Sequence, residues 1–299
     1  MKPSREGASE PFALDRRQMR RGFERASRSY DRAAILQTEV RQRLLSRLEY
    51  VRLEPELIVD AGCGTGHAAR ELKRRFPRAR VVALDIATGM LREATHQQGW
   101  RRRFERVCAD AERMPLPDES VDLIFSNLML QWCDVPDGVL REVQRVLKPR
   151  GLLTFSTLGP DTLMELRAAW AAVDERPHVS RFIDMHDLGD ALVRARLAEP
   201  VLDVERFTLT YDTAIALMRD LKAIGAQNAT AGRPSGLTGR ARFAAVTAAY
   251  ERFRIAGRLP ATYEVVLGHA WGAVSREGEV RVPLSQISRR APSTSLREN

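Results

Sequence analysis

The sequence predicts an α/β protein built on a doubly wound, mostly parallel sheet of seven strands. Apolar runs of strand length alternate with segments of helical periodicity, and a glycine-rich turn follows the first of these runs. Acidic residues stand where successive runs end. Strands that alternate with helices form parallel sheets covered on both faces, and 299 residues can bury a full core of this kind.

Two amphipathic helices are expected before the first strand, within residues 15–55. Their apolar residues recur at three- and four-residue spacings, first at Met19, Phe23, Ala26 and Tyr30 and then at Leu36, Val40, Leu44 and Leu48. These helices either form an N-terminal lid over a ligand site or pack on the sheet, and both alternatives remain open. Residues 1–14 are expected to be disordered.

The central segment, residues 56–157, carries the alternating pattern. Strands are expected near residues 56–60, 80–85, 104–108, 120–126 and 151–157. Helices are expected near residues 66–76, 87–96 and 137–147. Pro149 and Gly151 mark the point where a helix stops and the next strand starts.

Residues 158–272 are expected to form a C-terminal helical insertion and the closing strands. Helices are expected near residues 161–174, 186–197, 213–225 and 239–257. The segment VERFTLTY (204–211) has strand character, and the alternating run 261–269 is expected to close the sheet as an antiparallel edge strand. Residues 273–299 are polar and are expected to form a disordered tail.

The glycine-rich turn follows the apolar run Leu57 to Val59, which ends in Asp60. Gly62, Gly64 and Gly66 come next, and glycine permits positive φ and a close approach of ligand atoms to the backbone. The spacing is GxGxG, whereas the dinucleotide fingerprint is GxGxxG. A carboxylate beside the loop suits a cationic amino group and would repel a pyrophosphate, so the turn indicates a nucleoside cofactor with a positive charge.

Two further acids strengthen this interpretation. Asp85 ends the apolar run 81–84, where it is placed to hold two ribose hydroxyls, and Asp110 follows the next expected strand. The pattern resembles class I S-adenosylmethionine-dependent methyltransferases, which have a Rossmann-like fold. This resemblance implies that S-adenosylmethionine is the cofactor and that Asp110 meets its adenine amine. The implied cofactor contacts are Asp60, Gly62, Gly64, Gly66, Asp85, Ile86, Met90, Asp110, Ala111 and Asn127.

The composition limits the kinds of binding partner and the cell compartment that we expect. The net charge of +9 favours an acidic partner, but no nucleic-acid motif is present and Arg101 to Arg103 is expected to be a solvated turn. No apolar run is long enough to span a bilayer, and the first residues lack the apolar core of a signal peptide, so a cytoplasmic protein is expected. Three widely spaced cysteines indicate neither a disulfide nor a metal site.

Six segments carry a narrower resemblance, which covers roughly residues 15–272. They are FERASRSYDRAAILQ (23–37), SNLMLQW (126–132), FSTLGPDTLMELRAAW (155–170), HVSRFIDMHDLGD (178–190), LKAIGAQN (221–228) and LPATYEVVLGHAWG (259–272). These segments resemble the malonyl-acyl carrier protein O-methyltransferase family of biotin synthesis. The resemblance implies methylation of the free carboxylate of a malonyl thioester, carried by an acyl carrier protein or by coenzyme A.

Such an acceptor needs alignment and not a general base, because a malonyl carboxylate is already ionised at neutral pH. No catalytic acid–base residue is therefore expected. A carboxylate clamp is expected on Arg181, with Arg167 as second choice and Tyr30 as a hydroxyl donor from the lid. His178 and His186 are interpreted as structural or capping residues. Gln131 and Trp132 are expected to face the acceptor, the cofactor or the core.

Three other functions remain open. A methyltransferase acting on a quinone ring or on a free acid such as trans-aconitate would share the cofactor half, but it would lack the segments GPDTLMELR and PATYEV. A cofactor-binding assembly factor for a respiratory complex would bind the same cofactor without methyl turnover. An RNA methyltransferase is disfavoured because the chain has no appended RNA-binding module.

Overall fold

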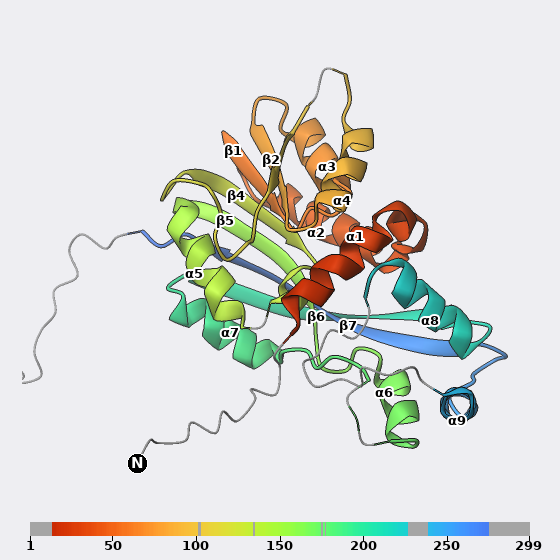
Figure 1. The fold of residues 1–299 in the computed structure, drawn as a ribbon. Coiled ribbons are helices and arrows are strands. Elements are labelled where there is room, and N and C mark those ends of the chain that lie inside the picture. Colours follow the sequence, from red (N-terminus) through yellow and green to blue (C-terminus); the bar gives the residue numbers. More distant parts are fainter. Residues whose placement is uncertain are drawn as a thin grey trace, which may run out of the picture.

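A sheet of seven strands runs through the molecule in the order β3-β2-β1-β4-β5-β7-β6 (Figure 1). The computed structural model describes residues 14–100, 103–133, 135–174, 176, 178–226 and 239–274. The strands are β1 (Leu57–Ala61), β2 (Arg80–Asp85), β3 (Glu105–Cys108), β4 (Val121–Asn127), β5 (Leu147–Leu158), β6 (Ala198–Tyr211) and β7 (Leu259–Trp271). Neighbouring strands from β3 to β5 are parallel, and β7 is antiparallel to both β5 and β6. The predicted doubly wound class is confirmed.

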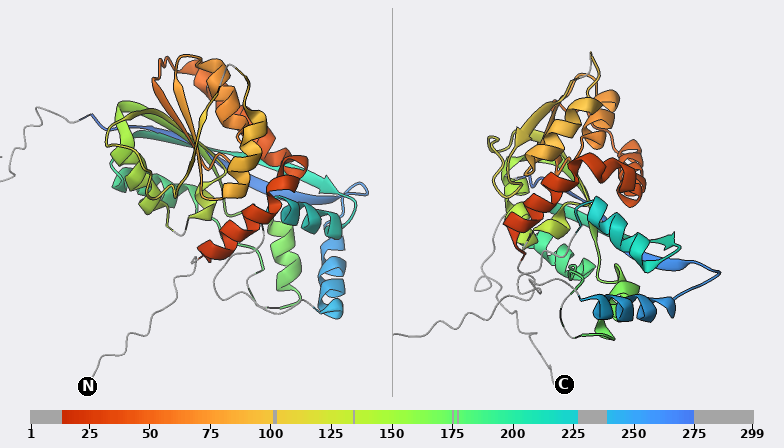
Figure 2. Two further views of the ribbon diagram at one scale, coloured as in Figure 1. Left: turned by 45° about the horizontal axis from the view of Figure 1, so that its top comes forward. Right: turned by 45° about the vertical axis from the view of Figure 1, so that its right-hand side comes forward.

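Helices cover both faces of this sheet (Figure 2). They are α1 (Arg16–Ala33), α2 (Ile35–Arg47), α3 (His67–Arg75), α4 (Thr88–Glu93), α5 (Pro136–Val146), α6 (Met164–Ala171), α7 (Met185–Arg194), α8 (Ala214–Ala223) and α9 (Arg240–Glu251). Apolar residues of α2, α3 and α4 share one core cluster, and those of α5 and α7 share the cluster on the opposite face. Val40 and Leu44 on one face and Leu140 and Leu192 on the other are fully buried.

The expectation that residues 261–269 form the edge strand is wrong in its position. β7 is antiparallel as expected, but it lies between β5 and β6, and β6 is the edge. The physical reason is burial. Residues Val265 to Leu267 are completely buried, as an interior strand requires, whereas β6 alternates half-buried and exposed residues along its whole length.

Several element ends also differ from the sequence prediction. The strand predicted at 204–211 begins at Ala198, and the strand predicted at 151–157 begins at Leu147. The helix predicted at 239–257 ends at Glu251, because a tight turn closed by Ile255 and Arg258 follows it. Ala256 and Gly257 have positive φ in this turn, a conformation that a helix cannot continue through.

β6 and β7 extend beyond the other strands, and α6, α8 and α9 pack on the projecting half (Figure 1). Tyr250 of α9 is completely buried there, and its hydroxyl donates to the carbonyl oxygen of Pro260 at 2.8 Å. The residues after Thr157 thus build a second half of the molecule on the same sheet.

Two buried glutamates fasten the chain after β5 to β7. Glu264 of β7 accepts a hydrogen bond from the Asp161 N–H at 3.0 Å, and Glu165 of α6 accepts one from the Thr262 N–H at 3.1 Å. Their side chains are more than nine-tenths buried, as Glu264 is 8% and Glu165 4% exposed. The hydroxyl of Thr162 adds a hydrogen bond to the carbonyl oxygen of Glu264. The segments GPDTLMELR and PATYEV, which set this sequence apart, are therefore in direct contact.

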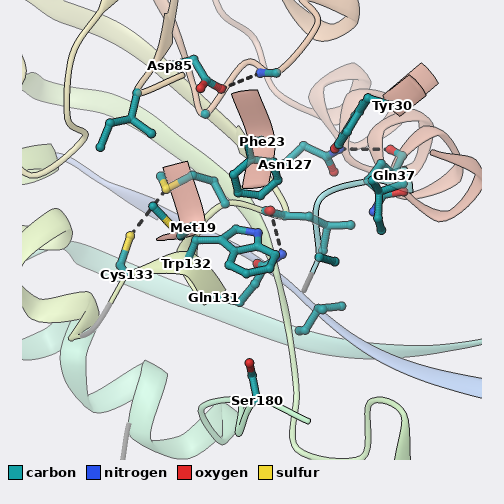
Figure 3. A pocket seen from close by; sticks show the side chains of 18 of the residues that line it. Met19, Phe23, Tyr30, Gln37, Asp85, Asn127, Gln131, Trp132, Cys133 and Ser180 are labelled. Carbon is teal, nitrogen blue, oxygen red and sulfur yellow. Dashed lines mark hydrogen bonds between the residues drawn. The ribbon is translucent and has the colours of Figure 1, made fainter. Parts of the chain in front are cut away.

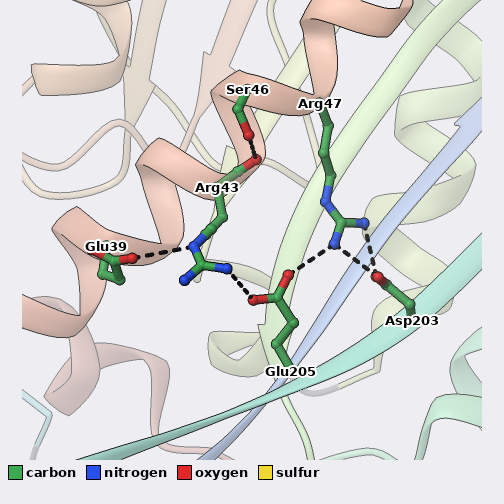
Figure 4. Close-up of polar contacts among 6 residues, drawn as sticks. All are labelled: Glu39, Arg43, Ser46, Arg47, Asp203 and Glu205. Carbon is green, nitrogen blue, oxygen red and sulfur yellow. Dashed lines mark hydrogen bonds and ion pairs between the residues drawn. The ribbon is translucent and has the colours of Figure 1, made fainter.

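The sequence left open whether the two N-terminal helices form a lid or pack on the sheet, and the two helices lie differently. α2 packs on the sheet, and its arginines bind the edge strand (Figure 4). Arg47 donates to both carboxylate oxygens of Asp203 at 2.8 Å, and Arg43 and Arg47 both reach Glu205. α1 instead crosses from α4 to α8, over the carboxyl ends of the strands (Figures 1 and 2).

The expectations for residues 1–13 and 275–299, and for Arg101 and Arg102, lie outside the described residues. Within the described ranges, no helix is both long enough and apolar enough to cross a membrane.

The buried hydrogen bond between Glu264 and the Asp161 N–H should contribute to the stability of the fold. Glu264→Ala removes the acceptor for the Asp161 N–H, so the free energy of unfolding should fall by about 1–3 kcal/mol. Glu264→Gln keeps an acceptor oxygen and should cost clearly less. Urea denaturation measures both, with the exposed Glu56→Ala as a control near zero. Equal losses for the alanine and glutamine variants would show that this hydrogen bond does not hold the segment.

Candidate active site

The loop between β1 and α3 is folded back onto the end of β2. The N–H groups of Gly62 and Cys63 both donate to the carbonyl oxygen of Leu84, at 2.8 and 3.0 Å. Gly62 has φ +73°, and a Cβ there would lie 2.3 Å from Cγ of Met129. Only glycine fits this position, because any side chain would collide with Met129 and strain the backbone.

Asp85 lies against this loop at the end of β2. One carboxylate oxygen accepts the Gly64 N–H at 2.9 Å and the other accepts the Ala87 N–H at 2.8 Å. Burial raises the pKa of Asp85 to about 6 despite these hydrogen bonds. A carboxylate has about four acceptor sites, so Asp85 retains capacity for further donors on the cavity side.

Asp60 is buried beside the same loop. It is 1% exposed, and Oδ2 has no hydrogen-bond partner among the described residues. Burial, with a smaller contribution from the charge of Asp85, raises the pKa of Asp60 to about 7. Asp60 is not among the residues that line the cavity described next.

A continuous cavity begins at this loop and runs below α1 (Figure 3). At the cofactor end it is lined by six of the predicted contacts besides Gly62 and Gly64, namely Asp85, Ile86, Met90, Asp110, Ala111 and Asn127. Tyr30 also lines it, together with Met19 and Phe23 of α1. Gly66, the residue just before α3, does not line the cavity. A Cβ at this position would face Ala94 and Phe104.

Asp110 and Asn127 already have protein partners. Asp110 accepts a hydrogen bond from Nη1 of Arg16 at 3.0 Å, and Arg16 also pairs with Glu112. The side-chain amide of Asn127 donates to the carbonyl oxygen of Gln37 at 3.0 Å, and its oxygen accepts the Ser156 hydroxyl. Residues of α1 and α2 thus contact the predicted cofactor residues directly.

Sequence reasoning missed two carboxylates that hold α1 in place. Asp31 accepts the Thr65 hydroxyl at 2.6 Å and lies 3.1 Å from Nε2 of His67, at the start of α3. Glu24 accepts the Gly89 N–H at 2.7 Å and the Thr88 hydroxyl at 2.9 Å, at the start of α4. Negative charge is favourable at helix N-termini. The spacing of seven residues, which puts both acids on one helix face, is the signal that could have indicated them.

Two polar groups of α2 were also missed. Oε1 of Gln37 and Nε of Arg41 are buried without a hydrogen-bond partner in the described part of the chain. They lie one helical turn apart, and Gln37 lines the cavity. The charge of Arg41 acts on both Asp60 and Tyr30, so Gln37, Arg41 and Asp60 belong to one neighbourhood, in which Nε of Arg41 also lies 3.5 Å from a carboxylate oxygen of Glu71.

The other end of the cavity is mostly apolar. Its lining there is given by Leu158, Leu163, Leu166, Val179, Phe182, Leu221 and Ile224, with His178, Ser180 and Tyr263 as polar members. Gln131 and Trp132 lie between the two ends, and Trp132 packs edge-on against Phe23 of α1 with ring centroids 5.1 Å apart. This end suits an acceptor with a short aliphatic body.

Neither predicted clamp arginine lines the cavity. Arg167 donates to the carbonyl oxygens of Pro160 and Thr162, at 2.8 and 2.9 Å. Burial, with the nearby charge of Arg181, lowers the pKa of Arg167. Arg181 is exposed, although its neighbours Ser180 and Phe182 reach the cavity. Of the three residues predicted to form the carboxylate clamp, Tyr30 is the one that lines the cavity.

The cofactor end fits S-adenosylmethionine. Oδ2 of Asp60, buried without a hydrogen-bond partner among the described residues, matches an ammonium group, and the guanidinium of Arg41, whose Nε lies 3.5 Å from a carboxylate oxygen of Glu71, suits a carboxylate. Gly64, where a Cβ would meet only Tyr30 at 4.0 Å, leaves room for close backbone approach, and Asp85 lies at the strand end where a ribose is bound in open α/β sheets.

Comparison with known proteins also indicates a methyltransferase. Residues 59–155 match the family model described as a methyltransferase domain. The malonyl-acyl carrier protein O-methyltransferase of Methylovorus sp. (strain MP688) is 54% identical over 274 residues, which are 90% of this chain and 93% of that protein. Its counterpart from Laribacter hongkongensis is 54% identical over 276 residues, with the same coverage.

A solved SAM-dependent methyltransferase from Thermotoga maritima shares the fold, with a TM-score of 0.51 and 18% identity over 85% of this chain and 99% of that one. The protein is a methyltransferase whose cofactor is S-adenosylmethionine. With relatives this similar over nine-tenths of its length, the chain belongs to the malonyl-acyl carrier protein O-methyltransferase family.

Proposed function

We propose that this protein methylates the free carboxylate of a malonyl thioester carried by an acyl carrier protein, with malonyl-coenzyme A as the alternative carrier. The product is the methyl ester, which enters an early step of biotin synthesis. One observation carries the proposal: a single cavity joins the predicted cofactor residues Asp85 and Asp110 to an end lined mostly by apolar side chains. The names of the similar proteins support the same substrate.

The cofactor residues would hold the three parts of S-adenosylmethionine. Asp85 would accept the ribose hydroxyls, while Asp110 and Ala111 would meet the adenine next to Ile86 and Met90. Gly62 and Gly64 would let the backbone approach the amino-acid part, with Asn127 beside it, whereas Gly66, outside the cavity lining, would only shape the turn. The ammonium would be held by Asp60 and Gln37 and the carboxylate by Arg41, whose guanidinium also pairs with Glu71 at 3.5 Å.

The chemistry demands little of the protein. When bound, S-adenosylmethionine supplies an electrophilic methyl group, and an acceptor carboxylate oxygen forms the new C–O bond as the C–S bond breaks. The acceptor is ionised at neutral pH, so no residue has to remove a proton. The protein aligns the two ligands and excludes water, and the apolar lining from Leu163 and Leu166 to Phe23 and Trp132 serves both ends.

The carrier protein would dock on the basic surface of α1. Along this helix, the side chains that face solvent include those of Arg17, Arg20, Arg21, Arg25, Arg28 and Arg32. Because α1 borders the cavity, these charges would steer an acidic carrier toward the entrance. Arg181, exposed beside the lining residue Ser180, would meet the carrier or its phosphate-bearing arm at the rim.

A cytoplasmic location is part of the proposal. The acceptor is an intermediate of the cell interior, and Cys63, Cys108 and Cys133 form no disulfide in the described part of the chain, as in proteins of a reducing compartment.

The activity is tested with S-adenosylmethionine and malonyl-acyl carrier protein. Mass analysis should show a gain of one methylene group on the malonyl carrier. Acetyl-acyl carrier protein has no free carboxylate and should gain nothing. A protein that binds S-adenosylhomocysteine but leaves the malonyl carrier unchanged would contradict the proposed substrate and favour a different acceptor.

Asp85→Asn should weaken S-adenosylhomocysteine binding by about 1.5–3 kcal/mol, because hydrogen bonds to a charged acceptor are lost while the shape is kept. Isothermal titration calorimetry measures the affinity, and Asp187→Asn on the exposed side of α7 serves as the matched control. Unchanged affinity in a folded Asp85→Asn protein would remove Asp85 from the cofactor site.

The raised pKa of Asp60 makes cofactor binding depend on pH. Below about pH 7 the buried carboxyl is neutral, and ionising it to meet the ammonium opposes binding. Affinity for S-adenosylhomocysteine should therefore rise as pH rises from about 5.5 to about 8, with a slope approaching tenfold per pH unit at the acidic end. In Asp60→Asn this part of the slope should vanish. An identical pH profile in both proteins would show that Asp60 does not face the ammonium.

A further inference from the structure

His178 occupies a defined position at the acceptor end of the cavity. Its ring lies flat against Trp170, the last aromatic residue of α6, with centroids 3.6 Å apart and an interplanar angle of 10°. Its Nε2 is 2.6 Å from Oδ1 of Asp174, and the side chain is only 11% exposed. His178 is also one of the residues that line the cavity. Trp170 thus holds one face of the His178 ring, and Asp174 holds its Nε2 edge.

Asp174 is itself held by several groups. Oδ1 also accepts the Arg176 N–H at 3.1 Å, and Oδ2 is buried, 3.6 Å from Nη1 of Arg242 on α9. Burial acts to raise the pKa of Asp174, but the hydrogen bonds from His178 and Arg176 and the charges of His178 and Arg242 hold it below the ordinary value. An ionised Asp174 accepts the Nε2–H of His178, which leaves Nδ1 as the ring's other polar atom.

The acceptor end offers an entering carboxylate few positive groups. Among the described residues that line the cavity, only Arg16 and His178 can carry a positive charge. Arg16 is paired with Asp110 and Glu112 at the cofactor end. A carboxylate moved from water into the apolar end is costly to bury unless it is paired there. His178 is the lining residue able to pair with it.

We propose that His178 binds the carboxylate of the malonyl acceptor through Nδ1–H, as an imidazolium whose ring is positioned by Asp174. This inference rests on the proposed function and names the residue that recognises its substrate. His178, which sequence reasoning interpreted as structural, takes the role first expected of Arg181 or Arg167.

A single donor has a chemical advantage over an arginine fork here. A guanidinium donates to both carboxylate oxygens, whereas one imidazolium N–H binds one oxygen and leaves the other without a hydrogen bond, with both of its lone pairs available to meet the methyl group. Esterification then removes the negative charge, so the product loses its ion pair with His178. The same residue therefore favours binding of the acid and release of the ester.

The test compares two ligands that differ by this charge. Malonyl-pantetheine and its methyl ester are titrated into the full-length protein saturated with S-adenosylhomocysteine, so that no turnover occurs. The wild-type protein should bind the acid more tightly than the ester. His178→Phe keeps the ring stacked on Trp170 but has no donor, and its Kd for the acid should rise about 10- to 100-fold while its Kd for the ester stays unchanged.

Three further variants sharpen the result. His178→Asn retains one neutral donor and Asp174→Asn retains the acceptor without its charge, so both should lose part of the preference for the acid. His186→Phe is the matched control: His186 also pairs with an aspartate, at 2.8 Å from Asp184, but it is 86% exposed and does not line the cavity. The His186→Phe variant should bind both the acid and the ester with the wild-type Kd. S-adenosylhomocysteine affinity, measured in every variant, reports intact folding, and the two asparagine variants carry the test if His178→Phe does not fold.

The outcomes separate this inference from the proposed function. If malonyl-acyl carrier protein is methylated and the His178 variants keep the full preference for the acid, the assignment of His178 is overturned and the function stands. If the wild-type protein neither methylates the carrier nor prefers the acid, both are overturned.

Discussion

The site depends on the hydrogen bonds that fold the β1 loop onto the end of β2. The Leu84 carbonyl accepts two N–H groups of this loop, and the carboxylate of Asp85 accepts a third from Gly64. Because β1 and β2 are parallel and in register, these bonds bring Asp60 and Asp85 to the same buried edge of the sheet. Burial then raises the pKa of both, so the protein holds two acids in a costly environment that a cationic ligand would relieve.

The acceptor end depends on a second set of contacts, which come from the reversed strand β7. Glu264 and Glu165 fasten the beginning of α6 to this strand. α6 in turn presents Trp170, against which the ring of His178 is stacked. A chain of buried contacts thus leads from the centre of the sheet to His178 in the lining of the cavity. The segments that are most distinctive in the sequence are the ones that build this connection.

The sequence was sufficient for features that are local. The alternating runs located all seven strands, and the acid that ends β2 lies on the cavity as expected, because strand ends meet at one edge of a parallel sheet. It was insufficient where a role depends on distant residues. The order of β6 and β7 is decided by packing on both faces, and the tethers from Glu24 and Asp31 to α4 and α3 join residues far apart in the chain.

The surroundings of His178 and of the two arginines could not be predicted from the sequence for the same reason. A histidine in an irregular segment has no periodic pattern to interpret, and the surroundings of His178 are supplied by α6 and the residues after it. Arg167 and Arg181 suited a carboxylate by residue type, but backbone carbonyls occupy the first and solvent surrounds the second. Residue chemistry narrows the candidates, and only the fold decides which of them face the cavity.

The charged surface of β6 has a consequence for the behaviour of the molecule in a crowded cell. An edge strand of this length carries a row of outward N–H and C=O groups that invites pairing with another polypeptide. Asp203 and Glu205 on one face are bound by arginines of α2, and Arg206 on the other face is bound by Asp161. An added strand would have to approach between these solvated ion pairs and bury them. The sheet therefore ends at β6, and its longest exposed margin is protected from aggregation without a covering helix.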